Sequence, residues 1–178
     1  MFDFQILSST TRYQGNKLRF DTLKLKTPEN KVVEWDRVVI SDIVYAVPIT
    51  KENEVILVQE WRTGPEKVLT QLVGARYDEN HAEISEIKRE LEEEIGLQGG
   101  TFTKLIGNLS NGPHLSGFKS YYLVEDFTLG KIKRDENEIL NIVKIPLDKV
   151  LKSLEQDYLT TTGTLLGIKY TLEKKSRF

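Results

Sequence analysis

The sequence of 178 residues predicts one α/β (α+β) domain in which helices pack on a mixed β-sheet. Three observations predict this fold class. The first half is rich in short strand-like segments, a strongly periodic helix follows, and the chain closes with more strands and two amphipathic helices. The length suits a single domain over residues 1–178, and no repeat, low-complexity segment or linker interrupts it.

The strands are expected from alternation and from turn residues. Leu18–Lys26 alternates apolar and polar residues, and Val32–Ile40 returns after a turn, which predicts a hairpin in a β-rich segment 1–40. Ile43–Thr50 is more continuously apolar, as expected for a central strand. Further strands are expected at Val55–Trp61, Val68–Val73, Phe102–Leu109, Lys119–Val124 and Ile139–Pro146.

Helices and loops complete the predicted order. The closing helices are expected at Leu147–Gln156 and Gly163–Lys175, and loops at Gly74–Asn80 and Ser110–Gly117. The central helix is expected over His81–Leu97, because apolar residues recur there at helical spacing. Its expected capping residues are Asn80 at the N-cap, Glu83 as the reciprocal partner of a capping box, and Gly96 at the end.

Composition excludes several classes of function. Hydrophobic residues make up 39% and charged residues 29%, which is ordinary for a soluble globular protein. The net charge of −2 argues against nucleic-acid binding, and no apolar run approaches the roughly 20 residues of a membrane span. Absent cysteines and the lack of a signal-peptide pattern fit a cytoplasmic protein. With only two histidines, a metal site would use oxygen ligands, which favours Mg²⁺ or Mn²⁺.

One face of the central helix carries almost only carboxylates. Five glutamates fall within an arc of roughly 100°: Glu83, Glu86, Glu90, Glu93 and Glu94. Like charges at i,i+3 or i,i+4 cost about 0.2–0.5 kcal/mol each, and only Arg89 leans toward them. The face is either a solvated acidic surface or a site for a divalent cation, which would relieve the repulsion.

The same segment resembles the Nudix box, whose pattern is G-x5-E-x7-R-E-U-x-E-E-x-G-U with U apolar. The second half matches fully, at Arg89, Glu90, Leu91, Glu93, Glu94, Gly96 and Leu97. The first half departs from the pattern, because His81 stands at the place of the box glutamate and Ala75 at the place of the box glycine.

Other segments resemble the ADP-ribose pyrophosphatase-like branch of that family. Gln71–Ala75 looks like the E-L-P-A-G strand with alanine and glycine exchanged, and Val55–Arg62 like the strand that ends in an aromatic–arginine pair. Pro113 and the acidic segment Asp135–Glu138 also fit that branch. The β-rich extension 1–40 is similar to the one that helps form a homodimer there.

The resemblance implies a Nudix-like α/β/α sandwich that hydrolyses the pyrophosphate bond of ADP-ribose or a related nucleoside diphosphate sugar. Glu90 and Glu94 would be ligands of Mg²⁺ or Mn²⁺, and Glu93 a further ligand or a supporting group. Gly74 would supply a backbone carbonyl to a metal, and Arg89 would orient the glutamates through ion pairs.

The remaining candidates have plain structural alternatives. Glu136 would be the general base, with Glu138 as the alternative, although both could lie in a solvated turn. Arg62, Trp61 and His114 are candidates for substrate contact, although a strand end and a surface loop explain them more simply.

Two functions remain open on the sequence, beside a third interpretation, an acidic structural domain that binds no ligand. The intact glutamates favour an enzyme. The departures at Gln71, Ala75 and His81 favour a catalytically weakened Nudix domain that binds a nucleotide or a protein partner.

Overall fold

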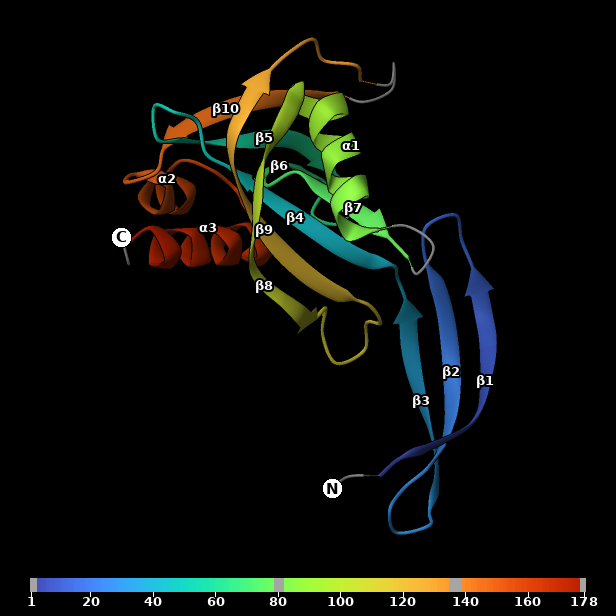
Figure 1. Cartoon of the computed structure of the whole chain (residues 1–178). Helices are drawn as coiled ribbons and strands as arrows, with labels where there is room; N and C mark the ends of the chain where they lie inside the picture. Colours follow the sequence, from blue (N-terminus) through green and yellow to red (C-terminus); the bar gives the residue numbers. More distant parts are fainter. Residues whose placement is uncertain (1–2, 79–81, 135–138, 177–178) are drawn as a thin grey trace. The chain divides into compact units, whose positions relative to one another are not determined.

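Figure 1 shows the computed structural model of the chain, which describes residues 3–78, 82–134 and 139–176. The elements are β1 (Gln5–Gln14), β2 (Arg19–Lys26), β3 (Val32–Val39), β4 (Asp42–Pro48), β5 (Glu54–Arg62), β6 (Lys67–Gln71), β7 (Gly74–Tyr77), α1 (Glu83–Ile95), β8 (Leu97–Ser110), β9 (Phe118–Leu129), β10 (Leu140–Pro146), α2 (Val150–Gln156) and α3 (Thr162–Lys175). They form two compact units: Met1–Asp42 with Leu109–Lys119, and Ile43–Asn108 with Ser120–Phe178. That the whole chain acts as one domain stays a prediction.

The first unit is a three-stranded antiparallel sheet in the order β1-β2-β3. The predicted hairpin is confirmed, since β2 and β3 pair from Arg19↔Val39 to Lys26↔Val32. The edge strand β1 extends this hairpin. Its sequence, QILSSTTRYQ, has a polar centre without alternation, so its strand character depends on pairing with β2.

The second unit is an α/β/α sandwich, as the resemblance implies. Its strands form the sheets β7-β4-β9-β8 and β10-β5-β6, and Figure 1 shows α1 on one side of them and α2 and α3 on the other. Strand β4 shows why both faces are covered. Its Val44 and Ala46 join the core beneath α1, whereas Val47 faces α3, where a Cβ on Gly167 would lie 3.3 Å from it.

Several predicted boundaries are wrong. Gly74–Tyr77 was expected in a loop but forms β7, because Ala75 is buried in the core beside α1. Strands β8 and β9 run beyond the predicted segments, β8 by the residues LQGGT at its start and β9 by the residues EDFTL at its end. Helix α2 begins at Val150 rather than Leu147, because a turn from Pro146 to Lys149 precedes it.

Helix α1 begins later than expected and ends at Ile95, before the predicted last residue Leu97, which starts β8. Its N-cap is Ala82, which offers no side-chain cap, whereas Asn80 and His81 lie outside the described residues. Gly96 ends the helix with a left-handed φ of 70°, which confirms the predicted stop. None of the described helices is long and apolar enough to cross a membrane.

Candidate active site

Arg89 gathers three glutamates of α1 around one guanidinium group. Its nitrogens lie 2.6 Å from Glu90, 2.5 Å from Glu93 and 3.3 Å from Glu86. Glu86 and Glu90 are only 19% and 20% exposed. Burial alone would lower the pKa of Arg89, but the adjacent carboxylates of Glu90, Glu93 and Glu86 raise it. One guanidinium group thus holds three carboxylates of the same helix together.

The C-terminal end of α1 is tied to the segment that leads toward the acidic residues 135–138. The Arg134 side chain donates to the carbonyl of Glu94 at 2.9 Å and to the carbonyl of Leu140 at 3.0 Å. Lys133 pairs with Glu92 at 2.8 Å, and this bond raises the pKa of Lys133. Arg134 therefore joins α1 to the residues on both sides of that segment.

Near the start of α1, Glu83 makes a tertiary contact in place of the predicted capping box. Its Oε2 accepts hydrogen bonds from the Tyr122 hydroxyl at 2.9 Å and from Lys104 at 3.1 Å. Burial raises the pKa of Tyr122, and the hydrogen bond to Glu83 raises it further. These bonds fix α1 against β8 and β9.

A pocket of about 330 Å³ opens beside β7. It is lined by Ile43, Tyr45, Arg62, Leu69, Gln71, Leu72, Gly74, Arg76 and Thr161. Arg62 is held by Glu60 at 2.8 Å and by Gln71 at 3.3 Å. Two guanidinium groups, an amide and a phenol in one pocket suit an anionic or oxygen-rich ligand.

The structure brings some predicted site residues together and separates others. Arg62 and Gly74 share the pocket. The α1 glutamates do not line it, but Ala75, which follows Gly74, packs in the core with Ile87 and Leu91 of α1.

The other candidates lie elsewhere. Trp61 is 54% exposed and does not line the pocket. His114 belongs to the first unit, where its Nδ1 lies 3.4 Å from the Asp36 carbonyl oxygen. Glu136 and Glu138 lie outside the described residues.

Arg76 and Tyr45 are among the pocket residues that the sequence-based prediction missed. Arg76 could have been found, because it lies two residues after Gly74 and therefore on the same side of a strand. Tyr45 gives no such signal, since it sits in an apolar run that predicts only a buried strand.

The carboxylates of α1 provide the oxygen donors that a hard cation needs. Among residues 3–78, 82–134 and 139–176, no three His, Cys, Asp or Glu side chains are grouped to hold a metal ion. Arg89 holds carboxylate oxygens of Glu90 and Glu93 through its ion pairs. Glu90 and Glu94, four residues apart on one helix face, are nevertheless a donor set of the chemistry that Mg²⁺ and Mn²⁺ prefer.

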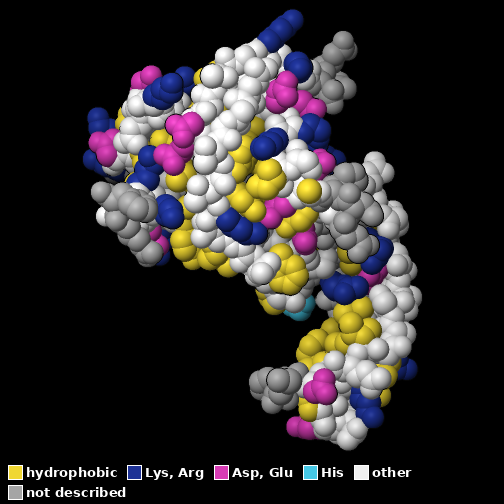
Figure 2. Space-filling model, in the orientation of Figure 1, with side chains coloured by type: hydrophobic (Ala, Val, Ile, Leu, Met, Phe, Trp, Pro, Cys, Tyr) yellow, Lys and Arg dark blue, Asp and Glu magenta, His cyan; other side chains and the backbone are white. Residues whose placement is uncertain are grey.

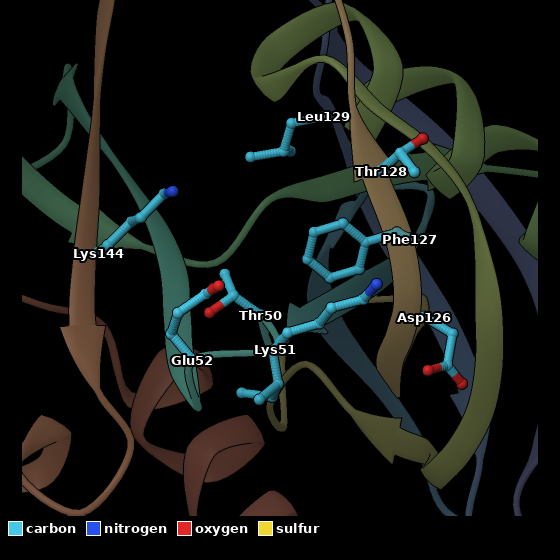
Figure 3. A pocket seen from close by; sticks show the side chains of 9 residues that line it. Thr50, Lys51, Glu52, Asp126, Phe127, Thr128, Leu129 and Lys144 are labelled. Atoms are coloured by element: carbon cyan, nitrogen blue, oxygen red, sulfur yellow. The ribbon is translucent and has the colours of Figure 1, made fainter.

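A second hollow of about 280 Å³ lies between the β4–β5 turn, the end of β9 and β10. Figure 3 shows the Phe127 ring beside it, with Lys51, Lys144 and Glu52 around it. Asp126 also lines it, so two lysines balance two carboxylates. This hollow therefore has no charge preference comparable with that of the pocket beside β7.

Comparison with known proteins supports the resemblance. No model of a known protein family matches the sequence. The chain is 22% identical over 166 residues to an ADP-ribose pyrophosphatase of Bacillus subtilis (strain 168). The aligned segment covers 92% of this chain and 90% of that protein. It is also 18% identical over 172 residues to a methanol dehydrogenase activator of Bacillus methanolicus. That alignment covers 96% of this chain and 93% of the activator.

The fold is shared with a solved structure. The crystal structure of an ADP compounds hydrolase superposes with a TM-score of 0.85 at 21% identity, over 98% of this chain and 95% of the other. The fold and the acidic helix thus define a Nudix-like α/β/α protein. The resemblance to the ADP-ribose pyrophosphatase-like branch of the Nudix hydrolases is confirmed, at low sequence identity.

Proposed function

We propose that the chain is a metal-dependent hydrolase that cleaves the pyrophosphate bond of ADP-ribose or a related nucleoside diphosphate sugar. The products would be a nucleoside monophosphate and a sugar phosphate. The observation that carries this proposal is the cluster of half-buried glutamates around Arg89, on the helix that packs against β7. The similarity to an ADP-ribose pyrophosphatase supports the choice of substrate class.

The glutamates and Gly74 are the proposed metal-binding groups. Glu90 and Glu94, with Glu93 and the backbone carbonyl of Gly74, would hold Mg²⁺ or Mn²⁺. A metal bound there would supply charge neutralisation on the phosphates and a more acidic water. Arg89 would hold the carboxylates in place through its ion pairs.

The pocket beside β7 is the proposed phosphate site. Arg62 is oriented by Glu60 and Gln71, and Arg76 lies in the same lining. Guanidinium groups bind phosphate oxygens in a fixed geometry, so these two side chains would orient the substrate. Trp61 and His114 remain proposals for substrate contact.

Glu136 is the proposed general base, with Glu138 as the alternative. They follow Arg134, whose bonds to Glu94 and Leu140 hold the neighbouring backbone to the end of α1. Single changes of Glu136→Gln and Glu138→Gln would separate the two. The base is the residue whose change lowers kcat and removes the acidic limb of the pH–rate profile.

The first unit is the proposed homodimer interface. Exposed apolar side chains gather on its sheet, including Phe4, Ile6 and Trp35, and Figure 2 shows this patch in yellow. A second copy of the chain would cover it. Sedimentation equilibrium should give twice the 20.5 kDa of the chain, whereas a monomer at micromolar concentration would rule this interface out.

A second candidate is a binding protein without strong catalysis. The similarity to a protein named as an activator of methanol dehydrogenase favours it, as do the departures at Ala75 and His81. This candidate predicts measurable nucleotide binding without turnover.

The experiment that separates the two uses purified protein and a panel of nucleoside diphosphate derivatives with Mg²⁺ or Mn²⁺. Product chromatography should show a monophosphate and a sugar phosphate from at least one of them. Binding with no turnover of any compound would favour the second candidate.

A further inference from the structure

We propose that Tyr45 is a substrate-binding residue whose hydroxyl contacts a phosphate oxygen of the bound nucleoside diphosphate. This inference rests on the proposed function and adds to it a residue that neither the motif nor the sequence pattern indicates. Three observations carry it: the place of Tyr45 in the pocket, the immobilisation of its ring, and the contrast with its stacking partner.

Tyr45 points away from α1 and into the pocket. Its neighbours Val44 and Ala46 join the core beneath α1, so the alternation of β4 turns Tyr45 to the opposite face. There it lines the pocket with Arg62 and Arg76.

The ring of Tyr45 is fixed on both sides. Its centroid lies 5.2 Å from that of Tyr121, with an interplanar angle of 17°. On another side, a Cβ built on Gly74 would lie 2.7 Å from Cε1 and 2.8 Å from Cδ1 of Tyr45. Only a glycine therefore leaves room for this ring at the start of β7.

Tyr121, in turn, is held by α3. A Cβ on Gly167 would lie 3.0 Å from its Cδ1, and a Cβ on Gly163 would lie 3.1 Å from its hydroxyl oxygen. The two rings thus fill a layer between β7 and the glycines of α3. A rigid wall of this kind needs no ordering when a ligand binds, so its contacts lose little conformational entropy.

The two phenols differ in what they can contact. The Tyr121 hydroxyl is buried, has no hydrogen-bond partner among the described residues and does not line the pocket. Tyr45 lines the pocket beside two cations and the amide of Gln71, all of which can donate hydrogen bonds to one anion. The geometry therefore indicates that Tyr121 serves in packing and that the Tyr45 hydroxyl contacts the ligand.

Two matched variants test the proposal, because each removes one hydroxyl and keeps both rings. Tyr45→Phe should raise KM for ADP-ribose on the order of tenfold, since a hydrogen bond to a charged group is lost. Its kcat and melting temperature should stay near those of the wild type. Tyr121→Phe should leave KM unchanged.

The outcomes separate this inference from the proposed function. If the wild type turns over ADP-ribose and Tyr45→Phe has the wild-type KM, or if both variants raise KM equally, the role of Tyr45 is wrong while the proposed function stands. If the wild type only binds ADP-ribose, calorimetric Kd values replace KM and the same ratios are expected. No turnover and no binding by the wild type would overturn both proposals.

Discussion

Gly74 has no room for a side chain, because the ring of Tyr45 lies where a Cβ would be. Gly74→Ala should therefore lower the free energy of unfolding by about 1–3 kcal/mol through overpacking. Gly64→Ala is the matched control, since a Cβ there would meet nothing within 4 Å. The measurement is the shift in melting temperature of each variant.

A double variant shows whether Tyr45 causes the effect. Gly74→Ala combined with Tyr45→Leu should recover part of the lost stability, because the smaller side chain leaves space for the new methyl group. Equal melting temperatures for the wild type and Gly74→Ala would contradict this account of the position.

At the residue scale, the sequence predicts those contacts that depend only on the spacing of residues along one helix. The i,i+4 glutamates and Arg89 needed only helical geometry to be found. The partner of Glu83 could not be found in this way. Tyr122 lies 39 residues away and reaches Glu83 only through the fold, so a local capping box was the wrong expectation.

At the scale of elements, Arg134 connects α1 with β10. Arg134→Ala would remove its bonds to the carbonyls of Glu94 and Leu140 and should cost about 1–3 kcal/mol, because the partly buried acceptors lose a charged donor. Chemical denaturation measures this loss directly.

Lys133→Ala is the control for that change. Its side-chain pair with Glu92 is exposed, with 62% and 39% of the two side chains accessible, so its loss should lower stability less than the loss of Arg134 does. A larger loss of stability for Lys133→Ala than for Arg134→Ala would show that the hydrogen bonds of Arg134 to Glu94 and Leu140 are not the stronger contact.

Elements with a strong periodic pattern could be predicted, and elements defined by their partners could not. Helix α1 and the β2–β3 hairpin follow their apolar periodicity. Strand β7 has four residues, too few for a pattern, and it forms because it pairs at the edge of the four-stranded sheet and buries Ala75. The edge strand β1 likewise depends on β2.

At the scale of the molecule, the first unit should lose stability in acid. Its buried Asp21 accepts hydrogen bonds from Arg19 at 2.9 Å, Arg37 at 3.2 Å and Thr11 at 3.0 Å. Arg19 contributes most to a pKa of about 2, compared with the ordinary 3.8, although burial opposes the shift. Because the folded pKa is the lower one, the stabilisation is complete above about pH 4 and disappears as the pH falls toward 2.

Trp35 reports on this unit. In a Trp61→Phe background it is the remaining tryptophan, and its fluorescence should follow denaturation of the three-stranded sheet. The stability advantage of this protein over its Asp21→Asn variant should shrink between pH 5 and pH 2. A constant difference across that range would contradict the depressed pKa of Asp21.

The layered fold could be predicted from the order of strands and helices, and the motif directed attention to α1. The pocket beside β7 could not be predicted in full. Its lining comes from four strands, from Leu72 between β6 and β7, and from Thr161 before α3, and no single sequence pattern relates these segments. The division into two units also depends on contacts between distant segments such as 1–42 and 109–119.

The central claim is that the glutamates of α1 bind the metal that supports pyrophosphate hydrolysis. The most direct measurement is the initial rate of ADP-ribose hydrolysis at saturating Mg²⁺ for the wild type, Glu94→Gln and Glu92→Gln. Glu92 pairs with Lys133 and serves as the control. The rate should fall at least about a hundredfold in Glu94→Gln, since even residues behind metal ligands can contribute that much. It should stay within about twofold in Glu92→Gln, since exposed ion pairs contribute little. A wild-type rate in Glu94→Gln would contradict the claim.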